Sequence, residues 1–268
     1  MKSSYRLALK RLITCAYRHL PRAYPRRIVL SYHAVGSGPW STSARQFEEQ
    51  IDWLKDHARF RSVDSLISQP PTSDALQVAI SFDDGYRSVL TQAAPVLQRA
   101  GATATVFVNT SQIADTQHVA SDPTAGYYPD EQFMLWSELD ELRNEGWQIA
   151  SHCVEHPDLP TQSSAVIRDQ LQRSKCELEQ RLATPCSGLA YPFGRADARV
   201  RAIAAECGYA WAVCSTHGRL TPSADRFALP RIDIRNNYSL GDFVAAVQGD
   251  LDYLGLVQML RHRFRFYR

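Results

Sequence analysis

Short apolar runs alternate with segments of helical periodicity along most of the chain. The apolar runs have the length and composition of buried strands, and they predict strands at 27–32, 78–82, 103–108, 147–150, 188–191, 209–213 and 229–234. The segments between them repeat apolar residues every three or four positions, which predicts helices at 43–57, 86–100, 137–146, 163–182, 197–206 and 239–248. Strands that alternate with helices indicate a parallel sheet with right-handed crossovers. We therefore predict an α/β fold, an irregular or incomplete barrel that no linker divides.

Residues that cap or break helices mark several of these boundaries. Ser43 is a suitable N-cap for the helix at 43–57, and Gly101 is a suitable stop after 86–100. Pro95 is expected to bend or break that second helix. Ser137 and Asp140 resemble a capping box.

The segment 109–134 has no periodicity of either kind. It contains Asp122-Pro123, Gly126 and Pro129 beside the aromatic pair Tyr127-Tyr128. A connection of this length in a compact domain is usually functional or mobile. Its aromatic residues are therefore candidates to line a substrate cleft.

Charge is unevenly distributed along the 268 residues, although the net charge is only +2. Residues 1–27 contain eight lysines and arginines, residues 254–268 contain four arginines, and neither segment has an acidic residue. The body at 28–253 holds the other 18 basic residues and all 28 acidic ones, so its charge is near −10. We expect a basic N-terminal segment, a central domain and a basic C-terminal tail, with an anionic membrane surface as a partner of both ends.

The N-terminal segment has helical spacing at 5–20, where apolar and basic residues occupy different sides. Two interpretations stay open. The helix either lies on an anionic membrane or packs on the body with its charged side in water.

Nothing in the sequence resembles a secretory leader or a membrane span. Lys10 and Arg11 interrupt the apolar patch at 7–9, and no run approaches the ~18 apolar residues of a transmembrane helix. The six cysteines form no CxxC pair, which is typical of reduced thiols. We expect a cytoplasmic protein, peripheral at the inner face of the membrane. Nucleic acid is not an expected partner, because no recognisable binding module accompanies the basic ends.

Candidate catalytic side chains follow three predicted strands directly: His33, Asp83, Asp84, His152 and His156. In parallel α/β barrels, catalytic groups collect where strands end. Adjacent carboxylates repel, and a divalent metal bound by one of them, with the other free as a base, relieves that repulsion. Two neutral imidazoles and one carboxylate suit such a metal, with both histidines on one side of the chain if their segment turns helically. An Asp-Asp-Gly turn or an HxxxH spacing alone is weak evidence, whereas the two together at strand ends are specific.

Three motifs in this order resemble those of the polysaccharide deacetylases, carbohydrate esterase family 4, whose barrel is also called the NodB-homology domain. They are Ser81–Gly85, Ser151–Pro157 and Ala190–Gly194. The resemblance spans roughly residues 28–235 and is nearest to the poly-N-acetylglucosamine deacetylase branch, which also opens with a Tyr-His pair like Tyr32-His33. It implies a distorted (β/α)7 barrel and metal-dependent removal of an N-acetyl group from an amino sugar.

The resemblance also implies roles for individual residues. Asp84, His152 and His156 would be ligands of one divalent metal, with zinc preferred over cobalt, manganese or nickel. Asp83 would be the general base. An oxyanion would be held by the metal and by a backbone N–H. Substrate and oxyanion binding would fall to the third motif, through Tyr191, Pro192 and Phe193.

The chain departs from the family pattern at several positions. Ala190 stands where the third motif often has the arginine that pairs with the base, and Arg231 on the last predicted strand is the candidate replacement. Cys153 stands where Ser or Thr is usual, and we expect it to pack in the loop rather than bind metal. The branch assigns the general acid to the histidine at the first strand end, so His33 is preferred over His217.

We therefore expect an N-deacetylase that acts on a glycan or a lipid-linked glycan precursor in cell-envelope biosynthesis. Two alternatives remain. One is a catalytically inactive barrel that binds glycan or membrane, and the other is a deformylase of a formylated amino sugar.

Overall fold

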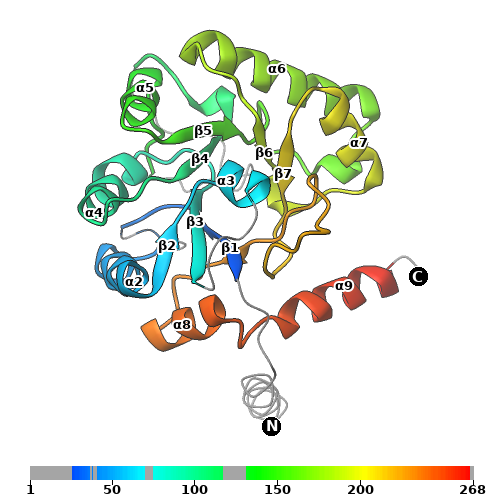
Figure 1. Ribbon diagram of the computed structural model, residues 1–268. Coiled ribbons are helices and arrows are strands. Elements are labelled where there is room, and N and C mark those ends of the chain that lie inside the picture. Colours follow the sequence, from blue (N-terminus) through cyan, green and yellow to red (C-terminus); the bar gives the residue numbers. More distant parts are fainter. Residues whose placement is uncertain (1–25, 37, 39–40, 70–74, 117–130, 266–268) are drawn as a thin grey trace.

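The computed structural model describes residues 26–36, 38, 41–69, 75–116 and 131–265 (Figure 1). The predicted helix at 5–20 and the aromatic residues Tyr127 and Tyr128 lie outside these ranges.

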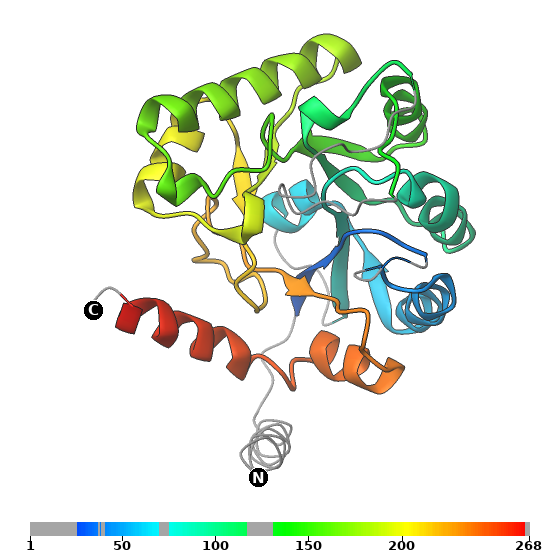
Figure 2. The same ribbon diagram turned by 180° about the vertical axis from the view of Figure 1, so that it is seen from behind.

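The strands of the described chain form a parallel sheet that curls into a distorted barrel (Figures 1 and 2). The strands are β1 (Arg27–Tyr32), β2 (Ala58–Phe60), β3 (Leu76–Phe82), β4 (Thr105–Val108), β5 (Gln148–Ser151), β6 (Gly188–Ala190), β7 (Trp211–Val213) and β8 (Ile232–Asp233). Their order is β7-β6-β5-β4-β3-β1-β8, with β2 beside the first half of β3. Leu229 pairs with Val213 of β7, while β8 pairs with β1, so the segment 229–233 connects the two ends of the sheet.

The helices surround this sheet (Figure 1). They are α2 (Ala44–His57), α3 (Val63–Ser68), α4 (Ala94–Arg99), α5 (Trp136–Asn144), α6 (Ser164–Leu182), α7 (Ala198–Glu206), α8 (Leu240–Gln248) and α9 (Tyr253–Arg265). Short turns of other helix types are η1 (Val89–Ala93), η2 (Thr110–Gln112), η4 (Leu159–Thr161) and η5 (Pro192–Gly194). None of the helices in the described ranges is long and apolar enough to cross a membrane.

Most of the predicted elements are confirmed within a few residues. Ser43 caps α2 through a hydrogen bond from the backbone of Gln46, as expected. The predicted helix at 86–100 is divided into the π-helical turn η1 and α4. Pro95 lies in the first turn of α4, directly after the π-helical turn, so the irregularity predicted for this proline occurs next to it.

Two predictions about local structure were wrong or incomplete. The capping box assigned to Ser137 and Asp140 does not form, because α5 begins one residue earlier and the Glu138 carboxylate accepts a hydrogen bond from the backbone of Leu135 (2.9 Å). The elements β2 and α3 were missed, because three and six residues are too short to display a period.

Alternation along the strands produces two separate apolar clusters. In β3, Val78, Ile80 and Phe82 pack with the surrounding helices, whereas Ala79 belongs to a smaller cluster inside the barrel. Phe107 of β4 belongs to the same inner cluster. Because successive side chains of a strand point to opposite faces, every second residue faces the interior.

Helix α3 closes the end of the barrel where the strands begin. The Leu66 carbonyl accepts a hydrogen bond from Arg27 at the start of β1 (2.8 Å). Asp64 accepts bonds from Gln148 at the start of β5 and from Trp211 at the start of β7 (2.5 and 2.7 Å). The interior is therefore blocked at this end, and a site on the barrel axis is open only where the strands finish.

Arg26 joins the start of the described chain to α8 and to the turn before α9. Its guanidinium forms two hydrogen bonds with Asp252 (2.7 and 2.8 Å) and one with the carbonyl of Val247 (2.7 Å). A Cβ at Gly255 would lie 2.1 Å from the carbonyl oxygen of His217, so α9 approaches the barrel closely there. Arg26 and Arg27, which the charge pattern assigned to the basic N-terminal segment, are buried parts of the body.

Candidate active site

The candidate catalytic residues continue the interior face of the strands. Asp83 lies two residues beyond Ser81, and His152 lies two beyond Ala150, both at strand ends opposite α3. The pleat therefore directs these side chains toward the barrel axis. Both are buried.

Asp84, His152 and His156 form a compact group. Their ligand atoms lie within 4.8 Å of one another. Among the described residues, this is the one cluster of histidine, cysteine or acidic side chains that could hold a metal ion. Oδ1 of Asp84 is 3.5 Å from Nε2 of His152 and 3.9 Å from Nε2 of His156. The turn that brings Asp84 here has positive φ at Asp84 (72°) and at Gly85 (77°). A Cβ at Gly85 would lie 2.9 Å from the side chain of Val108, so glycine also fits the narrow space.

The histidine pair converges through an irregular loop, so the helical turn that would also place both rings on one side is not what brings them together. The chain between His152 and His156 is not helical, and Cys153 has a φ of 73°. Buried Asn109, directly after β4, donates its amide hydrogens to the carbonyls of His152 and Glu155. Sequence reasoning missed this loop-positioning role, although Asn109 lies two residues beyond the inward-facing Phe107.

The ring orientation of His152 is fixed by a backbone hydrogen bond. Its Nδ1 donates to the carbonyl of Ala190 (2.7 Å), which leaves Nε2 as the unprotonated nitrogen toward Asp84. Burial lowers the pKa of His152 to about 4, and it lowers the pKa of His156 to about 4 as well. Both rings are therefore neutral at pH 7, which is the form that binds a metal ion.

Asp83 forms a buried ion pair with Arg231. Two guanidinium nitrogens of Arg231 donate to the two oxygens of Asp83, each at 2.7 Å, and both side chains are buried. Burial by itself would raise the pKa of Asp83, but the charge and hydrogen bonds of Arg231 outweigh it and hold the pKa well below its usual range. The pKa of Asp84 is raised, first by burial and further by its neighbour Asp83.

The third motif places its side chains differently from our expectation. Tyr191 is buried, and its hydroxyl donates to the carbonyl of Phe227 (3.1 Å), so its side chain belongs to the core. Pro192 is also buried. Phe193 is 52% exposed, and its ring lies 4.4 Å from that of His156, edge to face. Of the three predicted substrate-binding residues, Phe193 has the accessible side chain.

Gly194 cannot be replaced without moving the chain. Its φ is 63°, and a Cβ there would lie 2.4 Å from the backbone nitrogen of Ser215. Phe193 also has a positive φ, of 57°. The turn that carries Phe193 therefore packs directly on the loop after β7.

The two candidate acids occupy different surroundings. His33 is half-buried beyond the end of β1, near enough to Asp83 and Asp84 for its charge to lower the pKa of both carboxyl groups. His217 is buried against α9, where its Nε2 lies 3.8 Å from Asp252. The structure therefore brings His33, and not His217, to the carboxylate pair.

Cys153 is completely buried, and burial raises the pKa of its thiol. It is not part of the group formed by Asp84, His152 and His156. The residue packs in the loop, in agreement with the expectation.

The sequence profile of the family described as polysaccharide deacetylase matches residues 71–212, which is more than half of the chain. This chain belongs to the polysaccharide deacetylase family. Its members hydrolyse amide bonds, so the predictions of family and of enzyme class are confirmed.

Individual relatives agree with this assignment. The poly-beta-1,6-N-acetyl-D-glucosamine N-deacetylase of Staphylococcus epidermidis is 26% identical over 211 residues, which cover 74% of this chain and 69% of that protein. The Streptococcus pyogenes deacetylase PplD, solved with acetate, superposes with a TM-score of 0.70 at 23% identity, over 83% of this chain and 98% of that one. IcaB from Ammonifex degensii gives a TM-score of 0.71 at 20% identity, over 83% and 97% of the two chains. These two structures confirm the predicted distorted barrel of the NodB-homology type.

The buried pair yields a stability prediction. Arg231→Met leaves the Asp83 carboxylate buried without its cation, and we expect the free energy of unfolding at pH 7 to fall by about 3–5 kcal/mol. Urea denaturation measures this loss. Because the pair keeps the pKa of Asp83 low, its contribution is present at neutral pH and declines in acid, so the difference from wild type should narrow below about pH 4.

Arg195→Met is the matched control. Arg195 pairs with Asp158 at the surface, where its side chain is 47% exposed, so we expect a loss below about 1 kcal/mol. Equal losses in the two variants would contradict the stabilising role of the buried pair.

Proposed function

We propose that this enzyme removes the acetyl group from an N-acetylated amino sugar in a glycan or a lipid-linked glycan precursor. The observation that carries the proposal is the separation of the two adjacent carboxylates. Asp83 is held by Arg231, while Asp84 faces His152 and His156. Asp83 is therefore available to accept a proton, and Asp84 belongs to a cluster of side chains that can bind a metal ion.

The residues present fit one divalent metal ion. Asp84, His152 and His156 supply one carboxylate oxygen and two neutral imidazole nitrogens at buried or half-buried positions. This donor set suits zinc first, and cobalt, manganese or nickel after it. A metal ion bound there would polarise the acetamide carbonyl and make a water molecule more acidic.

The remaining steps fall to side chains of this chain. Asp83, kept ionised by Arg231, accepts the proton of the attacking water. An amine leaves very poorly as an anion, so the departing nitrogen needs a proton, and His33 beside both carboxylates is the donor. The backbone N–H of Phe193, at the exposed edge of the site, contributes a hydrogen bond to the oxyanion.

The ends of the chain support a membrane-associated substrate. In α9, the side chains of Leu256 and Leu260 are 50% and 54% exposed, and they lie one helical turn apart beside exposed Val257. The last turns of the helix contain Arg261, Arg263 and Arg265 in the sequence. Apolar residues followed by arginines suit the surface of an anionic membrane. An enzyme held at the inner face of the membrane meets lipid-linked sugar intermediates.

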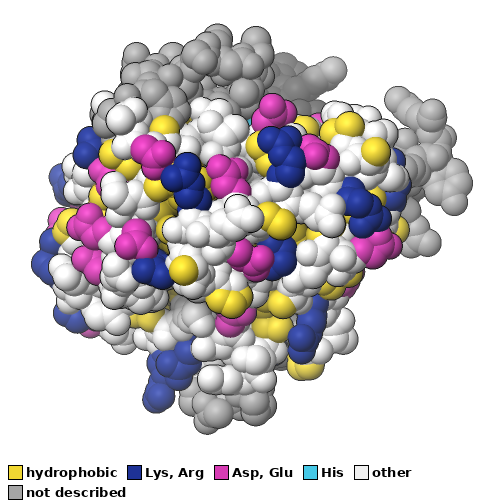
Figure 3. Space-filling model, turned by 90° about the horizontal axis from the view of Figure 1, so that it is seen from above, with side chains coloured by type: hydrophobic (Ala, Val, Ile, Leu, Met, Phe, Trp, Pro, Cys, Tyr) yellow, Lys and Arg dark blue, Asp and Glu magenta, His cyan; other side chains and the backbone are white. Residues whose placement is uncertain are grey.

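The described residues on the side of the molecule shown in Figure 3 form no comparable surface for binding an anionic membrane. There, lysine and arginine side chains are interspersed with acidic ones and form no continuous basic area.

Metal binding is the first test of this proposal. We expect about one divalent ion per chain in metal-loaded protein, measured by elemental analysis after dialysis, and a loss of most of it in His152→Ala. Asp83→Asn should retain the ion, because Asp83 pairs with Arg231 and is outside the ligand group. His57→Ala, on the exposed end of α2, is the control. Wild-type protein that binds no divalent ion would overturn the proposal.

Acetate release tests the roles of the two proton-transfer residues. Removing a general base or acid typically costs about 10²–10⁴-fold in rate, so we expect Asp83→Asn and His33→Ala each to lower kcat by about a hundredfold or more. Both variants should still bind metal. If Asp83→Asn leaves acetate release unchanged, Asp83 takes no part in the reaction. If the wild-type enzyme releases formate from a formylated amino sugar and no acetate from an acetylated one, it is the deformylase.

Binding to lipid vesicles tests the role of α9. We expect the full chain to float with vesicles that contain anionic lipid, and the double variant Leu256→Ser, Leu260→Ser to bind at least tenfold more weakly. The magnitude follows from about 1.5–3 kcal/mol for burying one leucine side chain. The control is Val166→Ser on α6, where Val166 is 41% exposed. Equal binding of all three proteins would rule out α9 as the contact.

A further inference from the structure

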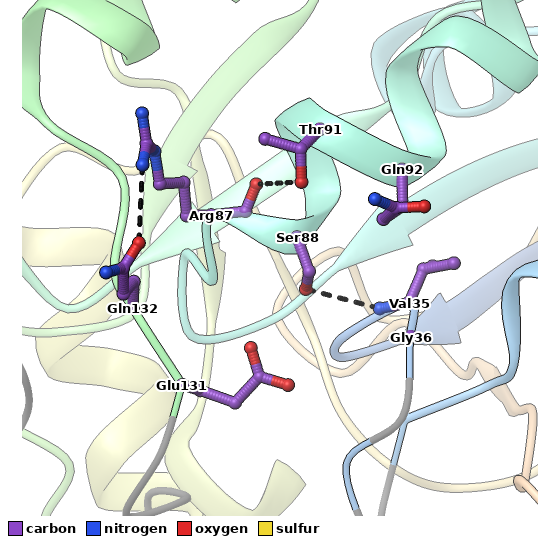
Figure 4. A pocket seen from close by; sticks show the side chains of 8 residues that line it. All are labelled: Val35, Gly36, Arg87, Ser88, Thr91, Gln92, Glu131 and Gln132. Carbon is purple, nitrogen blue, oxygen red and sulfur yellow. Dashed lines mark hydrogen bonds between the residues drawn. The ribbon is translucent and has the colours of Figure 1, made fainter.

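A polar pocket of about 320 Å³ lies between the segment after β1, the segment after β3 and residues 131–132 (Figure 4). Its walls include Val35, Gly36, Arg87, Ser88, Gln92 and Glu131. The volume is at the lower end of the range for pockets that hold small ligands, and it suits one sugar unit.

Two of the three segments that form the pocket follow the strands β1 and β3, which also lead to catalytic candidates. Val35 is two residues beyond His33, and its backbone N–H donates to the hydroxyl of Ser88 (3.4 Å). Arg87 is three residues beyond Asp84, and its backbone N–H donates to the backbone carbonyl of Gln132 (2.7 Å). Three residues of chain span at most about 10 Å, so the walls of the pocket begin within that distance of His33 and Asp84.

The positive charge in the pocket is already neutralised. Arg87 donates to the carboxylate of Glu138 through Nε (2.7 Å) and to the side-chain oxygen of Gln132 through Nη1 (3.3 Å). Figure 4 shows its guanidinium beside Gln132, at the edge of the pocket. Since Glu138 already compensates the charge of Arg87, the pocket does not favour a phosphate or an acidic sugar.

The negative charge of Glu131 is not neutralised in the same way. Among the described residues, its carboxylate accepts a long hydrogen bond from Ser41 (3.4 Å) and pairs with no lysine or arginine. A Cβ at Gly38 would lie 3.0 Å from Oε1 of Glu131, so Gly38 lies close to the carboxylate. Half-burial raises the pKa of Glu131, which indicates that its charge is partly withdrawn from water. Because Glu138 already pairs with Arg87, Glu131 is the charged side chain among the described lining residues that has no partner of opposite charge.

We propose that this pocket binds an amino-sugar unit that has already lost its acetyl group, with the sugar ammonium paired to Glu131. The inference rests on the proposed function, because deacetylation produces that unit: hydrolysis of the amide C–N bond leaves acetate and an amine, which takes up a proton. The neutral side chains of Ser88, Thr91, Gln92 and Gln132 offer partners for the sugar hydroxyls. An acetylated unit has no charge to present to Glu131.

This arrangement predicts how the enzyme treats a polymer. A deacetylated unit in the pocket places the neighbouring acetylated unit at the active site, so each product favours reaction at the adjacent position. Because the ion pair is present before the reaction begins, it should act mainly on KM.

Two oligomers of equal length test the inference: one fully N-acetylated, and one with a single free amino group next to an acetylated unit. We expect wild-type kcat/KM for acetate release to be about tenfold higher on the second oligomer, mainly through KM, and the ratio to fall to near one in Glu131→Gln. Glu145→Gln, which removes an exposed carboxylate after α5, should keep the wild-type ratio. Raising the salt concentration should weaken the preference, since the pocket is open to solvent.

Wild-type enzyme without a preference, or Glu131→Gln with the preference intact, would overturn the inference and leave the deacetylase function standing. No acetate from either oligomer would overturn the deacetylase function itself. In that case, calorimetry measures the affinity of wild type and of Glu131→Gln for a fully deacetylated oligomer. Equal affinities of the two proteins would overturn the inference.

Discussion

The ion pair between Asp83 and Arg231 is the interaction on which the rest of the site depends. The Asp83 carboxylate is stable in the barrel interior, after the end of β3, because the guanidinium of Arg231 donates a hydrogen bond to each of its oxygens. Arg231 is far from Asp83 in the sequence. The pair keeps Asp83 ionised and separates it from Asp84, although the same charge makes Asp83 a weaker base than a free carboxylate. Neither carboxylate has to share a proton with the other.

The pair also links the topology of the barrel to its chemistry. Arg231 immediately precedes β8, and β8 pairs with β1, which pairs with β3. The guanidinium lies over the ring of Phe107 on β4 and also donates to the carbonyl of Cys214 after β7 (3.3 Å). Closing the sheet through the segment 229–233 therefore positions the partner of the base, so the distorted closure of the barrel is part of the site.

Backbone strain in the described chain is concentrated around the same residues. Four residues other than glycine have a positive φ, and three of them are Asp84, Cys153 and Phe193, one from each motif. Such conformations cost about 1–3 kcal/mol each and persist where surrounding contacts hold them. Asn109, the Ala190 carbonyl and the close approach of Gly194 to Ser215 are those contacts here. The strain is what directs a carboxylate, two imidazoles and an exposed ring to one place.

The sequence by itself determined the order of strands and helices, the strand ends that carry the polar residues, and the family. Apolar periodicity and the order of three motifs are local properties, and they need no tertiary contact to be read. Arg231 was also found as a candidate, because the motif lacked an arginine at Ala190 and the last predicted strand contained one. The pocket beside Glu131 was not visible in this way, since its walls come from three separate loops.

Tertiary structure alone decided which candidates meet and how. It brought His33 and not His217 to the carboxylates, placed the Tyr191 side chain in the core, and joined His152 to His156 through a loop instead of a helical turn. It also gave Ala190 a function through its carbonyl, which any residue type could supply. These outcomes depend on contacts between segments far apart in the chain and on backbone atoms that every residue shares, and neither leaves a pattern in the sequence.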